Sequence, residues 1–178
     1  MPLRLLIIHH AVAEDAETFA LFGEEDDSRR PLTQEGREGI LQAAQGLRRQ
    51  VPDIDLLGTS PLLRATETAE ILAAVYDGRL EPVQVPELSP SSSPIATLRW
   101  LRSQPGLKTI ALVGHEPILS GLTGWLLIGN EKQVLALEEG GACLMEFPNG
   151  LVAGGARLLW ALTPAQLCAL SHESAASP

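Results

Sequence analysis

The sequence predicts an α/β sandwich, and three short apolar runs carry this prediction. The runs are residues 3–8, 55–59 and 109–113, and the first is interrupted only by Arg4. Each run is bounded by polar or turn-forming residues and is followed by a segment with helical spacing of apolar residues. An alternation of buried strands and helices is typical of a sheet whose parallel strands are covered on both faces.

Four helices are predicted between and after these runs. Thr33 can cap a helix that extends to about residue 50, and Glu35 in its first turn suits the positive end of the helix dipole. The next helix has Ser60 as its N-cap and Pro61 at its first position, and continues over residues 62–75. Two further helices are expected at residues 94–102 and 117–127.

The remaining segments are predicted to be a hairpin, two loops and a tail. Residues 142–147 and 156–162 should form two strands flanking the turn at 148–150. Residues 11–31, which are polar and acidic, are expected to be a loop bordering a site, and residues 87–93 a second loop. A single domain is expected over residues 1–170, with a disordered tail at 171–178.

The composition restricts the class of partner. The formal net charge of −9 and the sequence pI of about 4.9 argue against broad contact with nucleic acid or a membrane surface, since both require a basic face. Cys143 and Cys168 lack the close spacing of a metal or redox pair, which favours a reducing compartment. The first apolar run is too short for a signal peptide or a membrane span, so we expect a cytoplasmic protein. The sequence leaves the oligomeric state open.

Polar residues follow each of the three predicted strands. They are the pair His9-His10, the segment 60–64 that ends in Arg64, and the segment 114–117 that contains His115 and Glu116. Ligands of open α/β sheets bind at the carboxyl ends of the strands, so the three segments are expected to converge on one crevice.

Each of these residues also has an ordinary structural explanation. Arg64 lies in the first turn of a predicted helix, where free amides and the helix dipole favour an anion such as a phosphoryl group, but it also fits a solvated surface arginine. His115 fits a hydrogen-bonded structural histidine, and Glu116 fits a first-turn carboxylate. The combination of the three segments carries the functional prediction.

In order and spacing, the three segments resemble the histidine phosphatase superfamily, also called the phosphoglycerate mutase-like superfamily. Its signature is Arg-His-Gly after a strand, then Ser-Pro-x-x-Arg-x-x-x-Thr, then Gly/Ser-His after a later strand. The corresponding stretches here are residues 8–11, 60–68 and 113–117. The small size and residues 30–36 are closest to SixA-like phosphohistidine phosphatases. The resemblance implies a three-layer α/β/α sandwich with a mostly parallel central sheet.

Carried over residue by residue, the resemblance implies that His10 is the nucleophile and forms a phosphohistidine intermediate. It implies that Arg64 and His115 bind phosphoryl oxygens and offset charge in the transition state. His9, which stands at the position of the family's arginine, is placed in the same phosphate-binding set. Arg29 or Arg30, in the loop before the first predicted helix, is expected to supply a further cation.

The departures from the family pattern lie in the first motif. His9 replaces an arginine, and the loss of one such charged contact typically costs about 3 kcal/mol, or about 10²- to 10³-fold in rate. Ala11 replaces a glycine, and Val12 stands where SixA-like proteins commonly have an acid. The remaining candidates for a general acid are carboxylates that also fit solvated surface residues: Glu14, Asp15, Glu17 and Glu116. A phosphoramidate needs less help from an acid than a phosphate ester does, which favours phosphohistidine.

The sequence therefore predicts a phosphoric monoester or phosphoramidate hydrolase that works without a cofactor. Its substrate would be phosphohistidine on a protein or a small phosphorylated molecule. The alternative is a phosphatase-like module that has lost turnover and binds phosphate or a phosphorylated partner. A metal hydrolase using His9, His10, His115 and Glu116 is less favoured, because adjacent residues on a regular strand point to opposite faces. No metal is expected.

Overall fold

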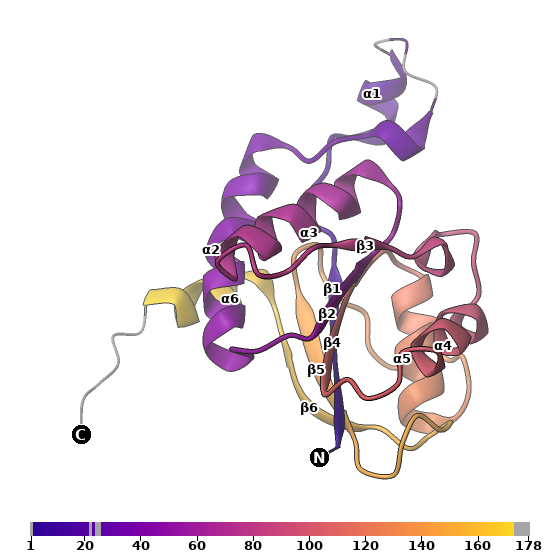
Figure 1. Ribbon diagram of the computed structural model, residues 1–178. Coiled ribbons are helices and arrows are strands. Elements are labelled where there is room, and N and C mark those ends of the chain that lie inside the picture. Colours follow the sequence, from indigo (N-terminus) through magenta and orange to yellow (C-terminus); the bar gives the residue numbers. More distant parts are fainter. Residues whose placement is uncertain (1, 22, 24–25, 173–178) are drawn as a thin grey trace.

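In the computed structural model a six-stranded sheet lies between two layers of helices (Figure 1). The structure describes residues 2–21, 23 and 26–172. The strand order is β3-β2-β4-β1-β5-β6. The first four strands of this order run parallel, and β5 is antiparallel to both of its neighbours, β1 and β6. This confirms the predicted mostly parallel sheet. The strands are β1 (Leu3–His9), β2 (Leu56–Thr59), β3 (Val83–Gln84), β4 (Thr109–Gly114), β5 (Ala142–Phe147) and β6 (Arg157–Leu162).

The helices form the two outer layers of the predicted three-layer sandwich. In Figure 1, α2, α3 and α6 cover one face of the sheet, and α4 and α5 cover the other. The α-helices are α1 (Ala16–Leu21), α2 (Gln34–Gln50), α3 (Leu63–Val75), α4 (Pro94–Arg102), α5 (Ile118–Ile128) and α6 (Pro164–His172), and the 3-10 helices are η1 (Asp27–Arg29) and η2 (Pro86–Leu88).

The central strand β1 is buried on both faces. Leu6 and Ile8 pack into the core under α2, α3 and α6, whereas Leu5 and Ile7 pack into the core under α4 and α5. All four side chains have no exposed surface, and burying each one contributes about 1.5 to 3 kcal/mol. The apolar run therefore anchors β1 between its neighbours β4 and β5, and gives the histidines at its end a rigid base.

The structure confirms one predicted helix cap and corrects the other. Thr33 caps α2, and its Oγ1 accepts a hydrogen bond from the Gly36 amide at 2.9 Å. Ser60 does not cap α3, because the helix begins later, with Leu62 at the cap position and no side-chain cap bond. Instead, Ser60 Oγ lies 2.8 Å from His115 Nε2. The hydroxyl is therefore part of a contact between two strand ends.

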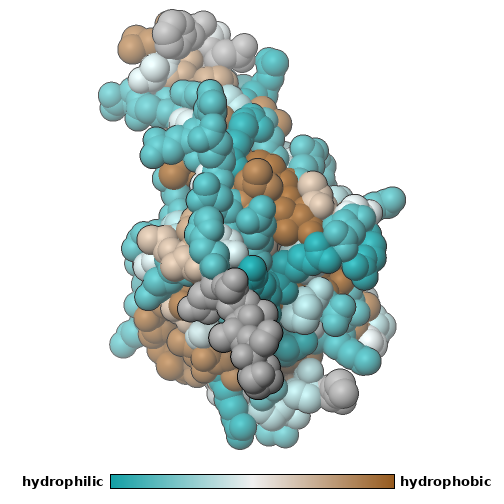
Figure 2. Space-filling view, turned by 90° about the vertical axis from the view of Figure 1, so that its left-hand side faces the viewer, coloured by the Kyte–Doolittle hydropathy of each residue, from teal (hydrophilic) through white to brown (hydrophobic). Residues whose placement is uncertain are grey.

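Three other segments differ from the prediction. The segment 11–31 is not wholly irregular, since it contains α1 and η1, and in Figures 1 and 2 the part that carries α1 projects from the top of the molecule. The short edge strand β3 and the helix α6 are additional elements. Helix α6 includes residues 171 and 172 of the predicted tail, and residues 173–178 lie outside the described part.

Helix α6 packs closely on α2. A Cβ at Gly46 would collide with the Leu167 carbonyl, so this contact requires glycine. The predicted hairpin of β5 and β6 is observed, with a longer connection than the predicted turn. Within the described residues, no helix is long and apolar enough to cross a membrane.

Candidate active site

Three neighbouring parallel strands deliver side chains to one edge of the sheet. His9 ends β1 and His10 follows it, Ser60 follows β2, and His115 follows β4. The ring centroids of His10 and His115 are 4.9 Å apart, and Arg64 Nε, from the first turn of α3, lies 3.3 Å from His10 Nε2. The expected convergence of the three motifs is observed.

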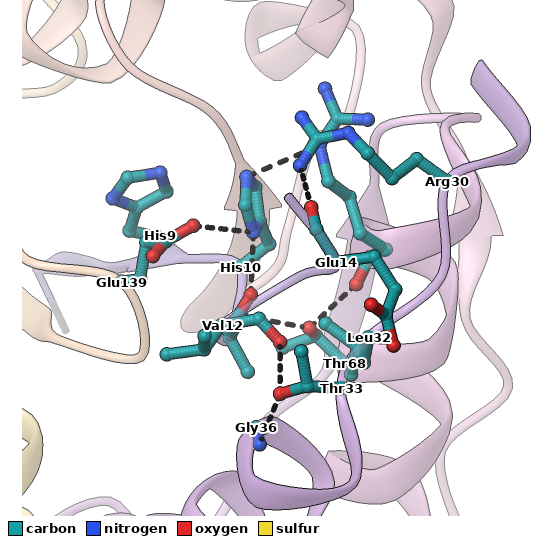
Figure 3. A network of polar contacts seen from close by, with 12 residues as sticks. His9, His10, Val12, Glu14, Arg30, Leu32, Thr33, Gly36, Thr68 and Glu139 are labelled. Carbon is teal, nitrogen blue, oxygen red and sulfur yellow. Dashed lines mark hydrogen bonds and ion pairs between the residues drawn. The ribbon is translucent and has the colours of Figure 1, made fainter. Parts of the chain in front are cut away.

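His9 and His10 lie on the same side of the chain although they are adjacent in sequence. Their ring centroids are 4.6 Å apart, and the ring planes are inclined by 73° (Figure 3). Regular strand geometry ends here, because the Gly140 amide reaches the carbonyls of both His9, at 3.2 Å, and His10, at 2.9 Å. The turn of the backbone brings both imidazoles into the same site.

The hydrogen bonds of His10 define its tautomer. Its Nδ1 lies 2.7 Å from the carbonyl oxygen of Ala11, which can only accept, so Nδ1 carries the ring proton. The neutral ring then has its lone pair on Nε2, where Arg64 Nε donates to it. Burial, together with the charges of His9, Arg64 and Arg30, lowers the pKa of His10 to about 3 against the effect of the Ala11 hydrogen bond. His10 is therefore neutral at physiological pH, and its nucleophilic nitrogen is unprotonated.

His115 has one nitrogen engaged and one without a partner. Its Nε2 contacts Ser60 Oγ, whereas Nδ1 is buried and has no hydrogen-bond partner among the described residues. Burial, followed by the charges of His10 and Arg64, lowers the pKa of His115 to about 2. Because a buried polar atom without a partner is rare, Nδ1 is a candidate contact for a ligand.

Two arginines meet on one carboxylate above His10. Arg64 Nη1 donates to the Asp27 carbonyl at 3.0 Å, and Nη2 lies 3.1 Å from Asp27 Oδ2. Arg30 Nε donates to Asp27 Oδ1 at 2.7 Å, and its Nη1 donates to the main-chain carbonyl of Glu14 at 2.6 Å. Arg30 thus lies in the site, as expected, and Glu14 contributes a carbonyl that holds it.

Asp27 carries a negative charge in this position. Burial raises its pKa, but the hydrogen bonds and charges of Arg30 and Arg64 outweigh this effect and hold the pKa below its usual value. The sequence did not single out Asp27, because it is one of several acidic residues in an irregular segment. Its only local signal is the spacing to Arg30, with which it forms an i,i+3 pair.

Glu139 is a second residue that the sequence did not indicate. Its Oε1 lies 3.9 Å from His10 Nδ1, and Figure 3 shows the side chain beside both His9 and His10. The residue follows a long irregular stretch after α5. The pairing of β5 with β1, together with the hydrogen bonds of the Gly140 and Gly141 main chain to His9 and His10, brings it to the site.

The structure argues against Glu116 as the general acid. Its carboxylate accepts hydrogen bonds from the Ser120 amide at 3.0 Å, the Ser120 hydroxyl at 2.5 Å and the Leu137 amide at 3.1 Å. These contacts commit the carboxylate to α5 and to the Leu137 main chain. Among the described residues, no group of three or more His, Cys, Asp and Glu side chains is placed to hold a metal ion.

The segment that carries Arg30 and Asp27 is attached to the residues after His10. Ala13 pairs with Leu32 in an antiparallel bridge, and the Thr33 amide donates to the Val12 carbonyl at 3.0 Å. A Cβ at Gly36 would collide with that carbonyl, so the first turn of α2 requires glycine to approach this closely (Figure 3).

A cavity of about 460 Å³ opens at the start of α3, and neither Arg64 nor Asp27 is among its lining residues. Residues of two kinds line it: Pro61, Leu63 and Thr66 at the start of α3, and Ser28 and Pro31 after Asp27. Leu63 and Ser28 are the sequence neighbours of Arg64 and Asp27, so the cavity lies near the candidate site without including its polar groups.

Comparisons with known proteins agree with this arrangement. The sequence model of the histidine phosphatase superfamily (branch 1) matches residues 5–89. An uncharacterized protein of Picosynechococcus sp. is 34% identical over 159 residues, which cover 88% of each chain. The region that the family model matches includes His10 and Arg64 and extends well beyond one motif.

Solved structures show the same fold. The protein histidine phosphatase SixA, in its complex with tungstate, has a TM-score of 0.78 at 23% identity and covers 93% of this chain and 99% of its own. The alpha-ribazole phosphatase from Shigella flexneri has a TM-score of 0.70 at 18% identity, with 91% and 97% covered. The family match supports phosphatase activity. This chain belongs to the histidine phosphatase superfamily.

Proposed function

We propose that this protein is a phosphatase in which His10 Nε2 accepts the phosphoryl group. The tautomer of His10 carries this proposal. The Ala11 carbonyl holds the proton on Nδ1, so that Nε2 is unprotonated where Arg64 meets it. An unprotonated nitrogen beside a guanidinium is what attack on a phosphoryl group requires.

The proposed reaction has two steps. His10 Nε2 attacks phosphorus, and the bond from phosphorus to the substrate breaks, with its electron pair leaving on the substrate atom. Nδ1 keeps its proton, so the phosphorylated ring carries a positive charge that Glu139 offsets from 3.9 Å. Water then attacks phosphorus, the lone pair returns to Nε2, and both protons of the water leave with inorganic phosphate.

Arg64, Arg30 and His115 would bind the phosphoryl oxygens during this reaction. The guanidinium of Arg64 is buried and directed at the nucleophile, and Nδ1 of His115 is the buried nitrogen without a partner. Fixed donors in a water-poor site stabilise developing negative charge strongly, because they need no reorganisation. The arginines can make these contacts once Asp27 is displaced.

We propose phosphohistidine on a protein as the substrate class. Asp27 contacts Arg64 through its carboxylate. This carboxylate is ionised, so it is poorly suited to give a proton to a leaving group. An imidazole that carries a proton on its other nitrogen leaves as a neutral molecule and needs no such proton. The cavity at the start of α3 is lined by Leu63 and Ser28, the sequence neighbours of Arg64 and Asp27, and would take a part of the protein substrate beyond the phosphoryl group.

The test is to trap the intermediate. The protein is incubated with a phosphorylated donor and analysed by mass spectrometry at neutral pH, where phosphohistidine survives. We expect a phosphoryl group on His10 that is lost in acid, and we expect His10→Ala to abolish both the label and hydrolysis. His172→Ala, which removes a histidine at the end of α6, is the matched control and should behave like the wild type.

The same experiment distinguishes the alternative function. If no donor labels His10 and a generic aryl phosphate is not hydrolysed, phosphatase activity is contradicted. Phosphate binding without turnover would then identify a binding module.

A further inference from the structure

We infer that His9 binds the phosphoryl group only as an imidazolium, and that Glu116, acting through the main chain of Leu137, is the positioning residue that imposes this condition. The inference rests on the proposed function in that it concerns the same phosphate site. His9, which stands where the family has an arginine, would be charged only when the ligand is bound. Glu116 would position Leu137 and would not act as a general acid.

The first step of the argument is the tautomer of His9. His9 is buried, and its Nδ1 lies 2.9 Å from the carbonyl oxygen of Leu137. A carbonyl oxygen can only accept, so Nδ1 carries the proton of the neutral ring and Nε2 carries the lone pair. A lone pair repels a phosphoryl oxygen. Nε2 becomes a donor only when the ring takes up a second proton.

The second step is that the main chain of Leu137 is fixed, so its carbonyl oxygen remains the partner of His9 Nδ1. The Leu137 amide donates to Glu116 Oε1 at 3.1 Å, and the other oxygen of Glu116 is held by the amide and hydroxyl of Ser120. The Leu137 side chain is buried in the core under α4 and α5. Leu137 is therefore fixed at its N–H by Glu116 and at its C=O by His9.

The third step concerns the charges that face His9. His10 lies next to His9, with the ring centroids 4.6 Å apart. Arg64, Arg30 and His115 belong to the same site, since the two arginines and His9 all affect the pKa values of His10 and His115. Arg64 and Arg30 are the permanent positive charges on this side of the site, whereas His10 and His115 are neutral. Glu139 lies beside the His9 ring, and Glu116 lies beyond Leu137. Because Nε2 of the neutral His9 ring has no proton to donate, we expect a second proton to be taken up together with a dianionic ligand.

A ligand that binds together with a proton binds more tightly as pH falls, by up to about tenfold per pH unit for one proton. A guanidinium at position 9 would stay charged and show no such dependence. We therefore expect the anion affinity of this site to decrease as pH rises, which a permanently charged residue at position 9 would not cause.

The experiment measures sulfate binding by calorimetry at constant ionic strength, since sulfate remains a dianion throughout the pH range tested. We expect the wild type to bind sulfate at least about tenfold more tightly near pH 5.5 than near pH 8.5, and to take up a proton on binding. His9→Arg should bind at both pH values with less than about a twofold difference and without proton uptake. His9→Gln, whose amide donates at every pH, should also lose the dependence.

Variants of Glu116 test the positioning role. Glu116→Gln keeps an oxygen that can accept from the Leu137 amide, and should retain the pH dependence of sulfate binding. Glu116→Ala removes the acceptor, frees the Leu137 main chain, and should flatten the dependence. If Glu116→Ala does not fold, His9→Gln and His9→Arg still decide the question.

Three results would overturn the inference: a wild-type affinity that does not change with pH, the same pH dependence in His9→Arg, or no sulfate binding at either pH. Because sulfate binding requires no turnover, this outcome is independent of the trapping experiment. A protein that binds sulfate with the expected dependence but never labels His10 would disprove only the phosphatase proposal.

Discussion

The site has two halves that differ in how they are held. Side chains at the strand ends and on α3 are almost fully buried, with 7% of the His10 side chain and 6% of the Arg64 side chain exposed. The half contributed by the segment 11–33 is more open, with 56% of the Asp27 side chain exposed. Buried groups are positioned before a ligand arrives, whereas exposed groups are screened by water and can move. We call the strand ends and α3 the sheet half of the site, and the segment 11–33 the loop half. We expect the sheet half to determine the catalytic rate and the loop half to adjust the affinity for the ligand.

Asp27 illustrates the role of the loop half. Its carboxylate occupies donors of both Arg64 and Arg30, the same donors that a phosphoryl group would use. A substrate must displace it to bind. The loop thus opposes ligand binding while keeping the two arginines together.

The largest effect in this comparison is expected for Arg64→Ala, in the sheet half. Removing the guanidinium takes away the donor at the nucleophile, and kcat/KM should fall by about 10²- to 10³-fold. Arg64→Lys should recover only part of this, since an ammonium cannot donate as a planar fork. Arg99→Ala, on α4, is the control. Steady-state kinetics with an aryl phosphate measure the change, and a loss below about tenfold would contradict the division of roles.

The next effect concerns stability and pH. Burial holds the pKa of His10 at about 3 and that of His115 at about 2, below the ordinary value of 6.5, so the folded state keeps both rings neutral. The unfolded chain binds more protons below pH 6.5. Stability is therefore present above that pH and is lost as pH falls toward the folded values, by up to about 1.4 kcal/mol per pH unit for each histidine.

Urea unfolding at pH 7 and pH 5 measures this loss. The double variant His10→Asn/His115→Asn should lose clearly less stability between these two pH values than the wild type. Equal losses in the two proteins would show that the buried histidines do not control the acid sensitivity.

A smaller effect of opposite sign is expected for Asp27→Asn, in the loop half. The neutral amide competes less well for Arg64 and Arg30, so the inhibition constant of inorganic phosphate should fall by about three- to tenfold, with little change in kcat. Asp26→Asn alters the neighbouring carboxylate, which caps η1 and accepts from the Ser28 amide. It is the matched control. Weaker phosphate binding in Asp27→Asn would mean that Asp27 assembles the site and does not oppose ligand binding.

The smallest effect is expected for Glu139→Gln. Its carboxylate is 3.9 Å from His10 Nδ1 and 43% of its side chain is exposed, so its interaction with the phosphorylated ring is screened. We expect kcat to fall by about threefold, with KM for an aryl phosphate unchanged. Burst kinetics that separate phosphorylation from hydrolysis measure this, and an unchanged kcat would remove Glu139 from the mechanism.

The sequence allowed the sheet half to be predicted better than the loop half. The buried run of β1, the cap at Thr33 and the motifs after three parallel strands each depend on local patterns, and these patterns implied the meeting of His10, Arg64 and His115. The cap predicted at Ser60 was wrong because α3 begins only at Leu63. The Ser60 hydroxyl accepts from the Leu62 amide at 3.4 Å and contacts His115, 55 residues away. Asp27 and Glu139 reach the site through loops, which have no periodicity to indicate where they fold.

The close approach of Gly36 to Val12 also bears on how this protein can be re-engineered. The Val12 carbonyl follows directly on Ala11, whose own carbonyl holds the proton of His10. A replacement loop grafted between the nucleophile and α2 would therefore have to bring its own helix start with it. We therefore expect that a graft without glycine at position 36 would place a Cβ against the Val12 carbonyl and disturb the nucleophile from the far end of the grafted segment.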